Sequence, residues 1–287
     1  MADIKNILFP TDFSENTREA LTFALEIARA CDGKLHIMHS IEEPYNFTMP
    51  DETAKNTEVN RSLSQTVKKL FENLEDEILG DSKYKELNIE TSIQTGRAVY
   101  TILEETKTRN VDMIIMGAQG RTGLKEVLFG STTAEVIQRS NVPVLVLPHE
   151  AVYKDFNRIT FATDYQDGDL KALQFVVELA KLFNSKLIVY HSILKTDLKS
   201  EIMFRGFKEL VTEKISYKNI EFEEDKSTHF LEAAINKVEQ QNVSLLVMVH
   251  YEKSFPPLPK QQSKEMSHYS EVPLLVLPGK ELANTKR

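Results

Sequence analysis

The sequence predicts an α/β protein built from two tandem copies of an open, parallel five-stranded sheet flanked by helices. Short β-branched runs alternate with longer segments of helical periodicity, which is typical of a Rossmann-like parallel sheet covered on both faces. Four segments of the first half also recur, in the same order, in the second half, as a tandem duplication would produce. We therefore expect two domains, at residues 1–150 and 151–287.

The recurring segments align the two copies residue by residue. They are NILFPTDFS with RITFATDYQ, KLHIMHSI with KLIVYHSI, NVDMIIMG with NVSLLVMV, and SNVPVLVLP with SEVPLLVLP. The first two pairs are offset by 152 positions, the third by 132 and the fourth by 130. Asp12 is thus matched by Asp164, and the second copy has lost about 20 residues between its second and fourth strands.

The first copy opens with a strand and a helix. Residues 6–12 are almost continuously apolar, as expected of a buried parallel strand. Ser14 offers a side-chain N-cap, apolar residues then recur at helical spacing, and Gly33 can end the helix. A second apolar strand follows at 35–41. The polar stretch 42–62 predicts a loop at the rim of the sheet.

The rest of the first copy continues the alternation. Apolar side chains three and four positions apart predict a helix over 62–79. The same two periodicities predict further strands at 89–95, 112–117 and 143–148, and further helices at 98–110 and 133–140. Residues 149–157 read as a linker to the second copy.

Composition argues against several classes of function. The net charge of −8 lies within residues 1–150, which carry 16 basic and 24 acidic side chains, so we expect no nucleic-acid partner. No apolar run is long enough to span a membrane. The single cysteine, Cys31, cannot form an intramolecular disulfide and indicates a reducing, cytoplasmic compartment. His39 and His191 recur at one strand position without metal-ligand spacing, which favours a structural role and no metal site.

Three glycines follow the strand at 112–117. In a parallel sheet, ligands bind beyond the carboxyl ends of the strands. Gly117 and Gly120 let the backbone turn tightly and approach a ligand at that edge. Asp12, at the end of the first strand, can accept hydrogen bonds from a sugar or base in the same crevice.

The third glycine precedes a helix start. Gly130 is followed by Ser131 and Thr132, and Thr132 with Glu135 has the spacing of a capping box. The free N–H groups of such a helix start favour an anion, phosphate above all. Arg121 and Lys125 add positive charge to an otherwise acidic half.

The pattern Gly-x2-Gly-x9-Gly-Ser/Thr, with ILFPTDFS before it and VPVLVLP after it, resembles the universal stress protein family. The resemblance covers nearly the whole chain, as a tandem universal stress protein, and implies ATP binding, accompanied by magnesium. The residues carried over are Asp12 and the backbone near Ser40 on the adenosine side, Met116, Gly117 and Gly120 at the ribose and α-phosphate, and Gly130, Ser131 and Thr132 at the outer phosphates, with Thr11 and Arg121 beside them.

The resemblance also implies how the two copies pair. The family's last strand commonly pairs antiparallel with its counterpart, so Val144–Leu147 is expected to pair with Leu274–Leu277 in an intramolecular pseudo-dimer. Whether such chains assemble further into a homo-oligomer stays open.

The second copy departs from the glycine pattern. Val249 aligns with Gly117, and the following loop, HYEKSFPPLPKQQSKE, has three prolines and no glycine. We expect this copy not to bind ATP in the family manner, leaving one nucleotide site per chain and a packing role or another ligand for the second copy.

Three hypotheses follow for the function. The first is an ATP-binding stress-response or signalling module. The second is an enzyme, a slow ATPase or phosphotransferase, for which the sequence offers no catalytic general base. The third is an interaction scaffold without nucleotide.

Overall fold

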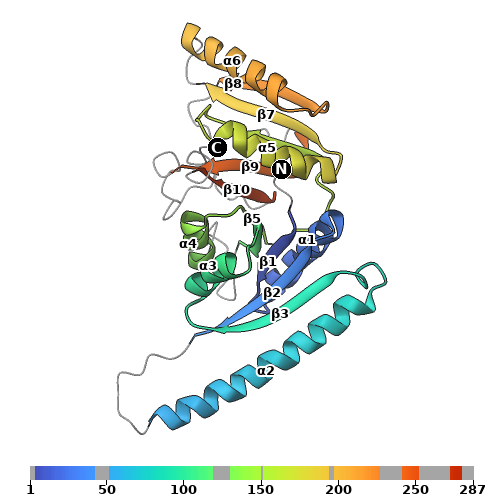
Figure 1. Cartoon of the computed structure of the whole chain (residues 1–287), viewed down its shortest axis with the longest axis vertical. Coiled ribbons are helices and arrows are strands. Elements are labelled where there is room, and N and C mark those ends of the chain that lie inside the picture. The colour runs from blue at the N-terminus through green and yellow to red at the C-terminus, as the bar shows by residue number, and fades with distance from the viewer. Residues whose placement is uncertain are drawn as a thin grey trace. The chain divides into compact units, whose positions relative to one another are not determined.

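The computed structural model describes residues 4–42, 52–118, 130–149, 151–193, 197–226, 241–251 and 272–279, with the side chains of the 52–80 helix described from residue 61. The chain is an α/β protein of the Rossmann-like type (Figure 1). It divides into two compact units. Described residues 4–118 and 130–139 form the N-terminal unit, and residues from 140 onward form the C-terminal unit.

The N-terminal unit holds four parallel strands in the order β3-β2-β1-β4. Its elements are β1 (Asn6–Pro10), α1 (Glu15–Cys31), β2 (Lys34–Ile41), α2 (Glu52–Gly80), β3 (Asn88–Thr95), α3 (Ala98–Thr108), β4 (Met113–Gly117) and α4 (Ser131–Arg139). Figure 1 shows the long helix α2 running alongside β3. Because parallel crossovers are right-handed, α1 and α2 cover one face of the sheet and α3 the other.

The C-terminal unit repeats this order, and its described residues add two strands, β10 and β5. Its elements are β5 (Val144–Leu147), β6 (Arg158–Ala162), α5 (Asp169–Leu182), β7 (Lys186–Ile193), α6 (Leu198–Lys214), β8 (Ile220–Lys226), β9 (Leu245–His250) and β10 (Leu274–Pro278). Five parallel strands run in the order β10-β9-β6-β7-β8. β5 pairs antiparallel with β10, with Val146 opposite Leu274.

The compact units therefore differ from the sequence repeats at one strand. β5 closes the first sequence repeat, yet it belongs to the compact unit that contains the second. All four residues of β5 are buried. The predicted domain boundary at residue 150 remains a prediction, and the division between compact units lies before β5 rather than after it.

Two local predictions are corrected. The helix α1 ends through Asp32, which adopts the left-handed conformation (φ 48°), and not through Gly33. Gly33 is needed for another reason, since a Cβ there would lie 2.8 Å from Cys31 Sγ and 3.0 Å from the Lys5 carbonyl oxygen. The predicted loop over 42–62 is also shorter than expected, because α2 already begins at Glu52.

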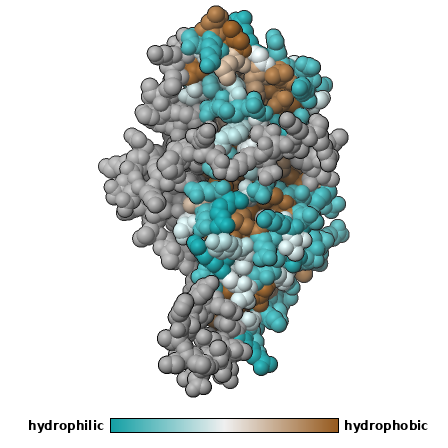
Figure 2. Space-filling model, turned by 60° about the vertical axis from the view of Figure 1, so that its left-hand side comes forward, coloured by the Kyte–Doolittle hydropathy of each residue, from teal (hydrophilic) through white to brown (hydrophobic). Residues whose placement is uncertain are grey.

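The face of the molecule drawn in Figure 2 is mixed in polarity where its residues are described. Within the described ranges, no helix combines the length and apolar content needed to cross a bilayer. Figure 2 shows teal and brown interspersed, with brown atoms near the top, where Figure 1 places α6. The exposed apolar side chains of α6 are Leu198, Ile202, Met203 and Leu210.

Candidate functional site

The order of the strands in the N-terminal sheet reverses direction at β1. β1 lies between β2 and β4 in the sheet. The chain runs from β1 outward to β2 and β3 on one side, and then returns past them to place β4 on the other side of β1. Ligands of open α/β sheets bind at this reversal, outside the carboxyl ends of the strands. The turn after β1, the end of β2 and the end of β4 therefore meet at the candidate site.

Asp12 lies in the turn between β1 and α1, and protein donors hold its carboxylate. Its Oδ1 accepts a hydrogen bond from the Ser14 backbone N–H at 3.0 Å and lies 3.1 Å from Thr17 Oγ1. Thr11 is nearly buried, and its hydroxyl accepts from the Phe13 N–H at 3.0 Å. Ser14 caps α1 by accepting from the Thr17 N–H, which confirms the N-cap prediction.

Aromatic side chains pack beside this turn. Phe13 adopts a left-handed backbone (φ 58°), which is costly for a bulky residue and indicates that the surroundings fix it. Its ring packs on His39 and Phe71, with centroids 5.2 and 5.0 Å away. The His39 ring contacts the Thr11 carbonyl through Nδ1 at 2.7 Å, a structural contact between β2 and the turn.

The ends of β2 and β4 supply backbone rather than free side chains. The Ser40 hydroxyl lies 2.5 Å from Thr101 Oγ1, so the Ser40 side chain is engaged with α3. That the backbone near Ser40 faces a ligand stays a prediction. Met116 and Gly117, the last residues of β4, are both buried.

The start of α4 is tied to the end of β4. The Gly130 N–H donates to the Ala118 carbonyl at 2.7 Å, and Thr133 Oγ1 donates to the Gly117 carbonyl at 3.0 Å. These two bonds hold the N-terminus of α4 against the carboxyl end of β4. Gly120 and Arg121 lie outside the described residues.

The predicted capping box is wrong. α4 begins at Ser131, so Thr132 lies inside the helix and does not cap it. Glu135 instead accepts hydrogen bonds from Arg97 at 2.9 Å and from Arg139 at 2.7 Å. Ser131 is exposed and Thr132 half-buried, and both lie in the first turn of the helix.

Sequence reasoning missed three residues of this site: Phe13, Thr17 and Thr133. Phe13 had a signal, because the aromatic after the aspartate recurs as Tyr165 in the second repeat. Tyr165 also adopts a left-handed backbone (φ 57°). No sequence pattern pointed to Thr17 or Thr133. Their hydroxyls matter because of the hydrogen bonds that they make, and periodicity does not predict those bonds.

The second repeat keeps the backbone conformation of this turn and its histidine contact, but the side chains around the turn differ. His191 Nδ1 contacts the Thr163 carbonyl at 2.6 Å, as His39 contacts Thr11. Tyr165 packs on His191, and its hydroxyl donates to Glu224 at 3.4 Å, where the first repeat has Ile93 at the matching register position. Burial raises the pKa values of Asp164 and Glu224, although the neighbouring His191 opposes both shifts.

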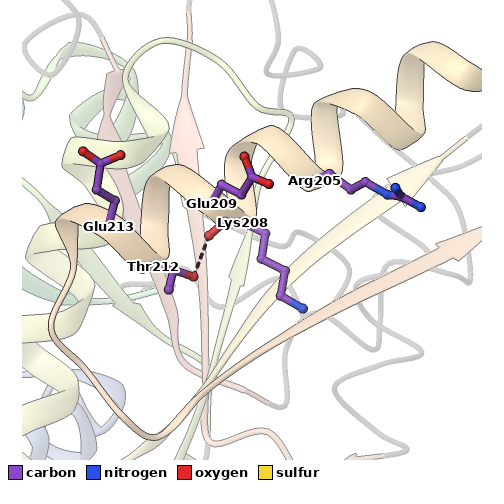
Figure 3. A pocket seen from close by; sticks show the side chains of 5 residues that line it. All are labelled: Arg205, Lys208, Glu209, Thr212 and Glu213. Carbon is purple, nitrogen blue, oxygen red and sulfur yellow. Dashed lines mark hydrogen bonds between the residues drawn. The ribbon is translucent and has the colours of Figure 1, made fainter.

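A shallow groove also lies on α6, and it does not resemble a binding site. It is lined by Arg205, Lys208, Glu209, Thr212 and Glu213, all from that one helix. Figure 3 shows these side chains pointing in different directions rather than converging. The only hydrogen bond drawn among them is local, from the Thr212 hydroxyl to the Lys208 carbonyl at 2.8 Å.

Comparison with known proteins shows the family to which the chain belongs. The profile of the universal stress protein family matches residues 3–148, which is half of the chain. The chain belongs to the universal stress protein family. The match covers the first repeat, in which Asp12, Gly117 and Gly130 lie.

Individual relatives also match about half of the chain. A universal stress protein of Methanocaldococcus jannaschii is 33% identical over 157 residues, covering 50% of this chain and 94% of that protein. The universal stress protein YxiE of Bacillus subtilis is 27% identical and covers 49% of this chain and 97% of that protein.

A solved structure covers both repeats. The crystal structure of a universal stress protein from Archaeoglobus fulgidus matches 97% of this chain and 98% of its own, with a TM-score of 0.67 at 19% identity. This likeness supports the fold of both repeats.

Proposed function

We propose that this universal stress protein binds one ATP in its first repeat and acts as a nucleotide-dependent stress-response module. The observation that carries the proposal is the pair of bonds from Gly130 and Thr133, which holds the start of α4 at the end of β4. Free N–H groups at a helix start bind phosphate. Asp12, in the turn that follows the neighbouring strand β1, can accept from the adenosine end of the same ligand.

The residues suit a nucleotide in their chemistry. Gly117 brings no side chain to the edge of the sheet, and Ser131 and Thr132 lie in the first turn of α4, where outer phosphates would bind. We propose that magnesium accompanies these phosphates, since phosphate-bound Mg²⁺ needs few protein ligands. Cys31 is the single cysteine of the sequence and its side chain is buried, and we propose a reducing, cytoplasmic location.

The test is nucleotide content and stoichiometry. The chain is purified without added nucleotide, denatured, and the supernatant resolved by ion exchange against adenine standards. ATP–Mg is then titrated calorimetrically into emptied protein. One equivalent per chain is expected, and Gly130→Val should abolish it. Gly206→Val is the control, because a Cβ at Gly206 meets no atom within 4 Å.

The outcomes separate the three hypotheses. Two equivalents per chain would contradict the single site. No binding in either measurement would leave an interaction scaffold as the better description. Phosphate release above the Gly130→Val background would make the protein a slow ATPase.

We also propose that β5 and β10 make the chain a built-in pair of repeats. Val146 and Leu274 lie directly opposite each other in the antiparallel pair, within the range that a disulfide can bridge. Val146→Cys with Leu274→Cys should therefore form an intrachain disulfide. The register-shifted control, Val146→Cys with Val276→Cys, should not, and equal crosslinking of both pairs would refute the pairing.

A further inference from the structure

Thr17 lies in the first turn of α1, next to the Asp12 carboxylate. Its Oγ1 is 3.1 Å from Asp12 Oδ1 and 2.9 Å from the Ser14 carbonyl oxygen, so its one hydroxyl hydrogen serves these two acceptors. The Thr11 hydroxyl donates to Thr17 Oγ1 at 3.2 Å, which turns the Thr17 hydrogen away from Thr11. Thr17 is only 7% exposed, so this geometry is held within the protein.

These contacts fix the orientation of the carboxylate. With Oδ1 held by the Thr17 hydroxyl and the Ser14 N–H, Asp12 cannot rotate freely about its Cβ–Cγ bond. A ligand that hydrogen-bonds to Asp12 then meets an acceptor already in place and pays less for ordering it.

The second repeat has lost this arrangement. Asp169 stands at the position of Thr17, 152 residues later, and an ionised carboxylate cannot donate to Asp164. Asp169 is 1% exposed and accepts from the Thr163 hydroxyl at 2.5 Å and from the Tyr251 hydroxyl at 2.8 Å. The buried carboxylate is thus satisfied from within the protein, and it adds negative charge beside Asp164.

We propose that Thr17 is a positioning residue that presents the Asp12 carboxylate to the nucleotide, and that Asp169 removes this function from the second repeat. The inference rests on the proposed ATP site. The two repeats would then differ at both ends of the site. The second repeat lacks the glycines at the phosphate end, and it lacks the threonine at the adenosine end.

The test is a double-mutant cycle on ATP affinity with Thr17→Val and Asp12→Ala. Thr17→Val keeps the side-chain volume, removes the hydroxyl, and should weaken ATP binding about tenfold. If Thr17 acts through Asp12, then Thr17→Val should cause no further loss in the Asp12→Ala background. Thr17→Ser, which keeps the hydroxyl, should restore wild-type affinity.

The control is Thr106→Val. Thr106 is also a buried helical threonine of the N-terminal unit, and its hydroxyl donates to the Leu103 carbonyl within α3. Its ATP affinity should match the wild type. Additive losses in the cycle, or failure of Thr17→Ser to recover affinity, would overturn the inference while leaving the ATP site intact. A wild-type chain that does not bind ATP would overturn both. If Thr17→Val does not fold, the comparison of Thr17→Ser with Thr17→Ala decides in the same way.

Discussion

Acidification should destabilise the N-terminal unit through a single buried histidine. The His36 side chain on β2 is 5% exposed, with Nε2 3.0 Å from Ser92 Oγ and 3.3 Å from Glu105 Oε2. Burial, followed by the charge of Arg109, lowers the pKa of His36 from 6.5 to about 4. Glu105 and Glu90 oppose this shift, but each also pairs with Arg109, which offsets their attraction for a proton on the imidazole.

The sign of the effect follows from the two pKa values. Between about pH 6.5 and pH 4 the unfolded chain binds a proton at His36 that the folded chain does not, so the free energy of unfolding falls as the pH falls. A shift of this size is worth about 2 kcal/mol at pH 5, because each pKa unit corresponds to about 1.4 kcal/mol and the titration is nearly complete in the unfolded state.

Urea denaturation at pH 7 and pH 5 measures this effect. The wild type should lose about 2 kcal/mol more than His36→Gln between the two pH values, because the amide cannot titrate. Carboxylates that titrate in this range affect both proteins and cancel in the comparison. Equal losses would refute the reasoning, as would an NMR titration that places the folded-state pKa of His36 near 6.5.

Two further substitutions test local packing. Gly279→Ala should destabilise the C-terminal unit by about 1–3 kcal/mol, because a Cβ would lie 2.4 Å from the Tyr251 ring and 2.9 Å from the His250 carbonyl oxygen. Urea denaturation measures this loss, and an unchanged midpoint would contradict the contact. Tyr84→Phe should lower the free energy of unfolding by about 1–3 kcal/mol, because it removes the hydroxyl that donates to the buried Glu26 carboxylate at 2.6 Å. The loss should appear as a lower thermal midpoint. Tyr100→Phe, at an exposed tyrosine, is the control and should leave the midpoint almost unchanged.

The sequence was most informative about strands and least about polar segments. Buried parallel strands are continuous apolar runs, and the duplicated sequence shows such runs at matching positions in both repeats. The α/β architecture and the position of Asp12 after β1 could therefore be predicted. The first part of α2 could not, because the stretch ETAKNTEVNRS has no apolar face. Among the side chains of this helix that the structure describes, from Arg61 on, Val67 is the first buried one.

The candidate site shows the same limit at the level of side chains. Glycine spacing pointed to the end of β4 and the start of α4, because backbone requirements are visible in sequence. The capping-box pattern of Thr132 and Glu135 was misleading, since Glu135 satisfies Arg97 and Arg139 instead. Competition between partners for one side chain is settled by tertiary geometry, which a short motif does not contain.

The placement of β5 has a practical consequence for dissecting the protein. A fragment cut at the repeat boundary, residues 1–150, would carry Val144–Leu147 without the antiparallel neighbour that these residues have in the whole chain. The complementary fragment would expose the edge of β10. Open strand edges recruit other strands, so each fragment should self-associate or aggregate. Separately expressed halves would then report on artificial assemblies, and a cut before Ser140 is the one that leaves this strand pair whole.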